Sequence, residues 1–506
     1  MTSRFTAYSQ ENGGRVILLF LLFLLAIYQF ITAGFNAFTI ICLIPLAVPI
    51  IYAAFHWTML TFWVLIFINY FIQFFAKHSL LPNGIPMSIY NELLEIILLA
   101  IAIIDARYSP HFERAGNLML MTILVWCGFC TLEVLNDTCG LGIDASSWYS
   151  GARMMAFQLL YAFLVFTLYI TKPERLVKYL KIWAILSLFS VYWTWQQQNI
   201  GFTASESIWL EAGGGRTHFV NGITRYFSTF SDAASYGCNA AATAVVFFVI
   251  AITTKIKKDR YFFLIVGLLI TKGMFASGTR TAMFCLVAGF GVYIILSKSI
   301  KVAIPVALIF VFFMSILIFT NIGQGDAQIR RMRSAFNKDD ASADVRDINQ
   351  TAIKKYIADA PWGIGLGGSE HIPANNKYKK LSVIAPDSEY VYIWIHTGPI
   401  GITLFVILTI IMFIGGCWIV FTKIKSRSLM GVGAGLCSAF AAIQLGGYAN
   451  QVLMQFPNCL IFYGGLAIVY ILPYIEPAWV EMEEKRFAEQ EEKKRLKLEK
   501  KLASRV

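Results

Sequence analysis

Long apolar runs recur along almost the whole chain and alternate with short polar connectors. A helix needs about 20 predominantly apolar residues to cross the hydrocarbon core of a bilayer. About 14 runs meet that length criterion, and they lie near residues 16–35, 37–54, 57–76, 88–105, 117–135, 152–170, 181–198, 233–252, 261–277, 281–297, 301–320, 389–421, 429–448 and 456–474. The pattern therefore predicts an all-α polytopic membrane protein with about 14 transmembrane helices.

Basic residues concentrate in alternate connectors between these runs. The basic connectors are 105–114, 171–181, 253–260, 297–301 and 422–428. Cytoplasmic loops carry an excess of Lys and Arg, so all of these connectors are predicted to face the cytoplasm. Both termini are then cytoplasmic, and the segments 199–232, 278–280 and 322–388 face outward. The run 16–35 has no small-residue cleavage site after it, so we interpret it as a retained span and not as a signal peptide.

The composition agrees with a membrane protein. The 506 residues are 57% hydrophobic and 14% charged, with a mean hydropathy of +0.63. These values exclude the soluble globular class. The net charge of +12 resides largely in the connectors, as membrane topology requires, so no nucleic-acid partner is predicted.

Two long outer segments and a charged end divide the chain. The predicted parts are N-terminal transmembrane helices at 1–198, a core at 199–421 with outer loops 199–232 and 322–388, C-terminal transmembrane helices at 422–475, and a charged cytoplasmic tail at 476–506. The larger outer loop is predicted to be partly helical. Ser342 is a candidate N-cap, apolar residues follow at helical spacing, and Pro361 with Gly363 forms a stop. We expect an amphipathic helix over the outer mouth.

Two short motifs are interpreted as structural. The letters "WCGFC" (126–130) resemble a thioredoxin redox site, but Cys127 and Cys130 lie inside an apolar run, which favours packing over chemistry. The letters "GIGLGG" (363–368) fit a dinucleotide-binding pattern. No strand is predicted before them and no apolar helix directly after, so a turn that needs glycine torsions is the favoured interpretation.

Arg280, in "FASGTRTAMF", lies between two apolar runs joined by a very short connector. A charge at membrane depth costs about 2.5–3.5 kcal/mol on insertion scales, so it points to a function, although a snorkelling anchor is the alternative. Arg225, Arg216 and Arg346 are predicted on the same outer face. Arginine grips phosphate in bidentate fashion, so this set predicts a site for a phosphate at the membrane surface, such as a lipid phosphate.

Acid and base candidates are fewer. Asp387 and Glu389 lie where the large outer loop re-enters the membrane, and His371 lies within that loop. A carboxylate there is suited to act as a general base on a sugar hydroxyl. The alternative for Asp387 is a helix N-cap, and both roles are compatible. No cluster has metal-ligand spacing, so a metal-independent site without a cofactor is predicted.

The stretches "RYFSTFSDAASYG", "ASGTRTA", "SADVRDINQTAIKKYIADAPWGIGLGG" and "PDSEYVYIWIHTGPIGI" occur in this order between about residues 200 and 420. Together they resemble the O-antigen ligase and polymerase superfamily of bacterial membrane glycosyltransferases. The resemblance implies a multi-pass helical enzyme of the inner membrane that acts at its outer, periplasmic face. The implied substrate is an undecaprenyl-diphosphate-linked oligosaccharide, with membrane lipid and a chain-length regulator or other polysaccharide-assembly proteins as further partners.

The resemblance also implies roles for particular residues. Arg280, Arg225 and Arg346 match arginines on the phosphate side of the family's site. Ligases of this family have a His-Asn pair where this chain reads Pro386-Asp387-Ser388-Glu389, so the ligase histidine is absent unless His371 replaces it. That difference favours a polymerase of lipid-linked repeat units of O-antigen, capsule or exopolysaccharide. A ligase that transfers glycan to a lipid or protein acceptor, and a flippase or other transporter, remain the alternatives.

Overall fold

The computed structural model describes residues 51–81, 86–104, 111–220, 222–334, 341–367 and 372–503, together with the single residues 21, 24, 28 and 49. The chain divides into two compact units, Met1–Val64 and Leu65–Val506. The candidate site lies wholly within the second unit. The predicted spans 16–35 and 37–54 fall almost entirely outside the described residues.

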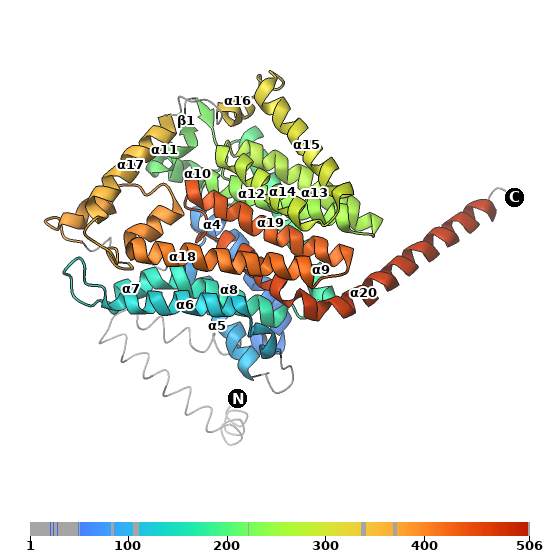
Figure 1. Cartoon of the computed structure of the whole chain (residues 1–506), viewed down its shortest axis with the longest axis horizontal. Helices are drawn as coiled ribbons and strands as arrows, with labels where there is room; N and C mark the ends of the chain where they lie inside the picture. Colours follow the sequence, from blue (N-terminus) through green and yellow to red (C-terminus); the bar gives the residue numbers. More distant parts are fainter. Residues whose placement is uncertain are drawn as a thin grey trace, which may run out of the picture. The chain divides into compact units, whose positions relative to one another are not determined.

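The described part of the chain is helical almost throughout (Figure 1). Its first half contains α4 (Thr58–Lys77), α5 (Ser88–Ile104), η2 (Phe112–Ala115), α6 (Leu118–Leu132), η3 (Glu133–Leu135), α7 (Ala145–Ala152), η4 (Arg153–Phe157), α8 (Gln158–Tyr169), α9 (Pro173–Asn199), α10 (Ala204–Trp209), η5 (Leu210–Gly214), α11 (Gly215–His218) and α12 (Ala233–Thr253). Its second half contains α13 (Lys257–Ala276), α14 (Arg280–Leu296), α15 (Ile300–Phe319), α16 (Ala327–Arg333), α17 (Ala341–Ile357), η8 (Lys377–Ser382), α18 (Glu389–Thr422), α19 (Arg427–Ala449) and α20 (Asn458–Ala503).

Within the described residues, eight helices are long and apolar enough to cross a membrane. A mostly helical membrane architecture is therefore confirmed, whereas the number of 14 spans and the cytoplasmic position of both termini stay predictions. The predicted runs 88–105 and 281–297 form helices of 17 residues, α5 and α14. Both are shorter than the length that the run criterion assumed.

Four helices, two of them rich in small residues, form the centre of the second unit. Helices α12, α13, α14 and α19 lie side by side (Figure 1). In the most apolar 18-residue stretch of α12, 89% is buried, and in that of α19, 78% is buried. Both helices therefore lie inside the bundle. Their sequences, "AASYGCNAAATA" and "GVGAGLCSAFAA", supply the small side chains that let helix backbones approach closely in a membrane. Cys127 and Cys130 on α6 are also buried and unpaired, which confirms their predicted packing role.

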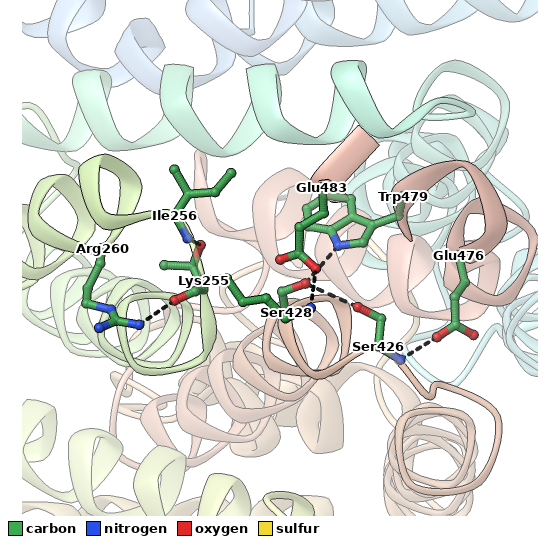
Figure 2. Close-up of polar contacts among 9 residues, drawn as sticks. Lys255, Ile256, Arg260, Ser426, Ser428, Glu476, Trp479 and Glu483 are labelled. Carbon is green, nitrogen blue, oxygen red and sulfur yellow. Dashed lines mark hydrogen bonds and ion pairs between the residues drawn. The ribbon is translucent and has the colours of Figure 1, made fainter. Parts of the chain in front are cut away.

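At the end of this bundle where α12 finishes and α19 begins, α20 is tied to the two neighbouring connectors (Figure 2). Glu476 Oε1 accepts hydrogen bonds from the backbone N–H groups of Lys425 at 2.7 Å and Ser426 at 2.6 Å. Trp479 Nε1 donates to Ser428 Oγ at 2.9 Å, and Glu483 pairs with a lysine of the α12–α13 connector. The predicted boundary at 475/476 thus falls inside one continuous helix. One face at the beginning of the charged tail is packed, because Glu476, Trp479 and Glu483 bind the neighbouring segments.

The other end of the bundle carries the two segments that are predicted to face outward. Loop 199–232 contains short helices and a two-stranded antiparallel hairpin of β1 (Phe219–Val220) and β2 (Ile223–Thr224). Asp232 caps α12 by accepting from the N–H groups of Ala234 and Ser235. In loop 322–388 the expected amphipathic helix is α17. It begins at Ala341, so Ser342 lies inside the helix and the N-cap prediction for Ser342 is wrong.

Candidate functional site

A cavity of about 320 Å³ opens where α14 begins and α19 finishes. Its lining is rich in arginine, and we name it the arginine pocket. The lining residues are Arg225, Gly278, Thr279, Arg280, Thr281, Phe284, Arg331, Arg346, Leu445, Tyr448, Ala449 and Asn450. They come from five separate segments of the second unit, so the pocket is assembled by tertiary packing.

The floor of the arginine pocket is the turn between α13 and α14. Gly278 has a φ of +57°, a left-handed conformation that favours glycine, and it lets α14 start directly at Arg280. The lining residues Thr279, Arg280 and Thr281 therefore surround the N-terminus of a 17-residue helix. The unpaired N–H groups and the positive dipole end at such a terminus favour an anion.

Arg225 approaches the same turn from the hairpin side. Its Nη1 donates to Thr217 O at 2.8 Å and its Nη2 donates to Thr279 Oγ1 at 3.1 Å. Its Nε is buried without a hydrogen-bond partner among the described residues. Burial and then the positive charge of Arg331 lower the pKa of Arg225 to about 10, with Asp232 opposing the shift and Arg280 adding to it. The guanidinium groups thus repel one another, and an anion in the pocket would relieve that repulsion.

Arg331 is a lining residue that the sequence analysis did not select. It lies on α16, and its Nε donates to Gly278 O at 2.9 Å. The hydrogen bond holds α16 against the α13–α14 turn. The basic run "IRRMR" in the outer loop 322–388 was the available signal, but three arginines on one short helix do not reveal which of them turns inward.

The four predicted arginines do not all meet. Arg280, Arg225 and Arg346 line the arginine pocket, and each is half-buried. Arg216 on α11 is exposed and is not a lining residue. The structure therefore brings three of the predicted arginines together with Arg331 and leaves Arg216 outside.

One side of the arginine pocket is apolar. Phe284 on α14 and Leu445 on α19 are 40% and 38% exposed, and Tyr448 is 70% exposed. Next to them Asn450 Nδ2 donates to Thr281 Oγ1 at 3.1 Å, which closes the end of α19 onto α14. A cationic floor beside an exposed apolar side suits a ligand that has a charged head and an apolar chain.

Asp387 lies beside the arginine pocket without lining it. Its φ is +53°, and one carboxylate oxygen accepts from Asn349 Nδ2 at 2.8 Å. Asn349 follows Arg346 by three residues on α17, so the two side chains are neighbours on one face of the helix. The N-cap alternative for Asp387 is wrong, because α18 begins at Glu389 after Ser388 and the Asp387 side chain is bound to α17.

Glu389 is directed away from the pocket lining. It is 3% exposed, and its Oε2 accepts from the backbone N–H groups of Leu453 at 2.9 Å and Met454 at 3.4 Å. It therefore anchors the segment between α19 and α20. His371 lies outside the described residues. His218 is buried, with its Nδ1 bound to Gly214 O, and burial lowers its pKa to about 4.

The predicted glycine turn follows α17. Gly363, Gly365 and Gly367 have φ values of +74°, +85° and +73°, which confirms a turn that needs glycine torsions. A Cβ added at Gly367 would collide with the backbone oxygen of Ser147 on α7. The turn therefore packs backbone against backbone on α7.

Comparison with protein families finds one match over this region. Residues 265–406 match the model of a family described as O-antigen ligase, which confirms the superfamily resemblance drawn from the sequence. The matched range contains Arg280, Arg331 and Arg346 and extends from α13 into α18. No curated protein matches the chain.

Proposed function

From the O-antigen ligase region that forms most of its arginine pocket, we propose that this chain is a membrane glycosyltransferase that polymerises lipid-linked oligosaccharide repeat units. The proposed donor is an undecaprenyl-diphosphate-linked glycan at the outer face of a bacterial inner membrane. The acceptor is a sugar hydroxyl of a second lipid-linked unit. No nucleotide sugar, metal or cofactor is part of the proposal.

The observation that carries the proposal is the convergence of four arginines from different segments on one cavity. A diphosphate has several anionic oxygens, and guanidinium groups bind such oxygens in bidentate fashion. Arg225 and Arg331 sit on either side of the turn that begins α14. Phe284 and Leu445 offer an apolar surface beside it, where the polyprenyl chain would leave the pocket for the bilayer.

The proposed reaction is a single displacement at the anomeric carbon of the donor. The acceptor oxygen forms the new bond to that carbon, and the bond from the carbon to the diphosphate oxygen breaks. The hydroxyl proton goes to a base, and the lipid diphosphate leaves with the bond's electron pair. Arginines held in place before the reaction stabilise the charge that develops on the leaving group, which is often the largest catalytic contribution.

We assign the base to Asp387. The hydrogen bond from Asn349 holds its carboxylate on the helix face next to Arg346. The following residue, Ser388, donates to Gly447 O at the end of α19, one residue before the lining Tyr448. Glu389 is less suited, because its oxygen already binds two backbone N–H groups.

A ligase is the second candidate, because the matched family model is described as O-antigen ligase. The two activities share the donor and the displacement and differ in the acceptor. The lack of a His-Asn pair before α18 favours the polymerase.

The test compares a deletion strain with the same strain carrying the gene on a plasmid. Mass spectrometry sizes the glycans on the undecaprenyl carrier, and a gel sizes those on the final surface acceptor. A polymerase is expected to leave single repeat units on the acceptor when it is deleted. Long chains that accumulate on the carrier, with none on the acceptor, would instead identify a ligase. Unchanged glycans on both would refute glycosyl transfer.

A further inference from the structure

A second cavity, of about 350 Å³, lies between the α6–α7 segment and the glycine turn. It is lined by Glu133, Val134, Asn136, Asp137, Cys139, Leu141, Gly142, Asp144, Ser147, Trp148, Ile364, Gly365 and Leu366. We name it the acidic cavity, because its lining holds three carboxylates and no lysine or arginine. Its volume falls in the range of small-molecule sites.

The walls of the acidic cavity are held by hydrogen bonds between distant segments. Asn136 Nδ2 donates to Trp362 O at 2.8 Å and to Glu133 Oε2 at 2.7 Å. Asn376 Nδ2 donates to Cys139 O at 2.7 Å, which ties the 136–142 connector to loop 322–388. These contacts give the cavity a fixed shape, so its polar groups keep their positions.

One carboxylate in the acidic cavity is buried and incompletely bonded. Glu133 is 5% exposed, and among the described residues Asn136 is the one hydrogen-bond partner of its side chain, through Oε2. Glu133 Oε1 has no hydrogen-bond partner among the described residues and is not one of their sequestered polar atoms, so it is an accessible acceptor for a ligand or water in the cavity. Asp137 also uses a single oxygen, Oδ1, which accepts from Gly142 N at 2.8 Å.

The chemistry of the lining selects the class of ligand. An anion is disfavoured by the carboxylates, so this is not a second phosphate site. No group of three acidic, His or Cys side chains in the described residues converges as a metal site would require. Separated acceptors instead suit a ligand with several hydroxyl or amino donors spread around one ring. Trp148, whose Nε1 donates to Cys130 O at 2.7 Å, adds a fixed aromatic surface with one polar and one apolar part.

Helix α17 runs from the arginine pocket towards the glycine turn, whose residues line the acidic cavity. Arg346 lines the arginine pocket, and Ile357 ends the helix shortly before the glycine turn. The two residues are roughly 16 Å apart along the helix axis, at 1.5 Å per residue. A glycan whose diphosphate is bound by the arginines would therefore reach the acidic cavity with a sugar several units from the phosphate.

We propose that the acidic cavity is a sugar subsite that takes a neutral or amino sugar, and not an acidic one, of the lipid-linked oligosaccharide. The proposal rests on the proposed function of the arginine pocket. The carboxylates of Glu133 and Asp137 accept hydrogen bonds from the sugar, and Trp148 packs against its less polar face. The subsite thus contributes to substrate binding and selects which repeat unit enters.

The experiment uses the full-length protein in nanodiscs and the lipid-linked repeat unit extracted from the deletion strain. The double variant Glu133→Gln/Asp137→Asn keeps both side-chain shapes and removes both charges. Hydrogen bonds to charged acceptors are stronger than those to neutral ones, so about a tenfold or larger rise in KM is expected, with kcat within about twofold of the wild type. The matched control is Asp359→Asn, which removes an exposed carboxylate of loop 322–388 and is expected to leave KM unchanged.

The outcomes separate the two proposals. An unchanged KM in the folded double variant, or a fall in kcat alone, overturns the sugar subsite. Retained polymer formation in Arg280→Ala overturns the proposed function itself. If the double variant elutes as an aggregate, the single variant Asp137→Asn, at an exposed position, is measured in its place and must raise KM on its own.

Discussion

At the residue scale, the arginine pocket is a set of like charges held together. Arg225 is fixed by Thr217 and Thr279, and Arg331 is fixed by Gly278. Such an arrangement costs electrostatic energy in the absence of an anion. Burial first, and then the positive charge of Arg331, lower the pKa of Arg225 to about 10. The guanidinium groups are therefore expected to contribute to binding and catalysis and little to stability.

The first prediction compares Arg280→Ala and Arg331→Ala with the exposed control Arg216→Ala. Loss of a donor that faces developing charge commonly lowers kcat by about 10²- to 10³-fold, so both pocket variants are expected to lose that much activity. Arg216→Ala is expected to keep the wild-type rate, because Arg216 lies outside the pocket lining. The measurement is polymer formation per unit of membrane-inserted protein. An equal loss in the control would contradict the assigned pocket.

At the element scale, α17 carries a lining arginine of the pocket and the asparagine that holds the proposed base. Arg346 contacts the arginine pocket, and Asn349, three residues later, binds Asp387 at the start of α18. The helix therefore couples the phosphate side of the site to the proposed base. The glycine turn after α17 then fixes the same helix against α7.

The second prediction concerns Asp387→Asn and Asn349→Ala, with Asp347→Asn as the control. Asp347 is exposed on α17. Removing a general base typically costs about 10²- to 10⁴-fold, so Asp387→Asn is expected to lose at least 10²-fold in kcat with little change in KM. Asn349→Ala leaves the carboxylate present but unheld, and a smaller loss is expected. Steady-state kinetics with the lipid-linked unit measure kcat and KM for the three variants. A fully active Asp387→Asn enzyme would exclude Asp387 as the base.

At the scale of the whole molecule, the helices separate two chemically different ends. The arginine pocket lies where α12 begins and α19 finishes, whereas the contacts of Glu476 and Trp479 lie at the opposite ends of these helices. The alternation of basic connectors assigns the first end to the outer face and the second to the cytoplasm.

The third prediction tests that orientation by labelling single added cysteines in intact cells. Arg216→Cys and Glu481→Cys both replace exposed residues, one at each end. A membrane-impermeant maleimide is expected to label position 216 in intact cells and position 481 only after the membrane is opened. The wild-type protein serves as the background control, because its described cysteines are buried or half-buried. Labelling of position 481 from outside would reverse the assigned topology.

The sequence by itself determined the helical membrane architecture, and it predicts an outer position for the site. Apolar length and the placement of lysine and arginine are local properties, so α4, α12 and α19 were predicted within a few residues. The costly position of Arg280 was visible for the same reason. The glycine turn at 363–367 was predictable because positive φ values favour glycine.

Only the tertiary structure decided which side chains meet. Arg331 entered the arginine pocket and Arg216 did not, because the direction of each depends on how α16 and α11 pack and not on its neighbours in the chain. Glu389 differed from Asp387 by two positions, yet it bound the segment before α20 while Asp387 bound α17. Convergence of residues from distant segments is a property of helix packing, which no local pattern of charge or hydrophobicity contains.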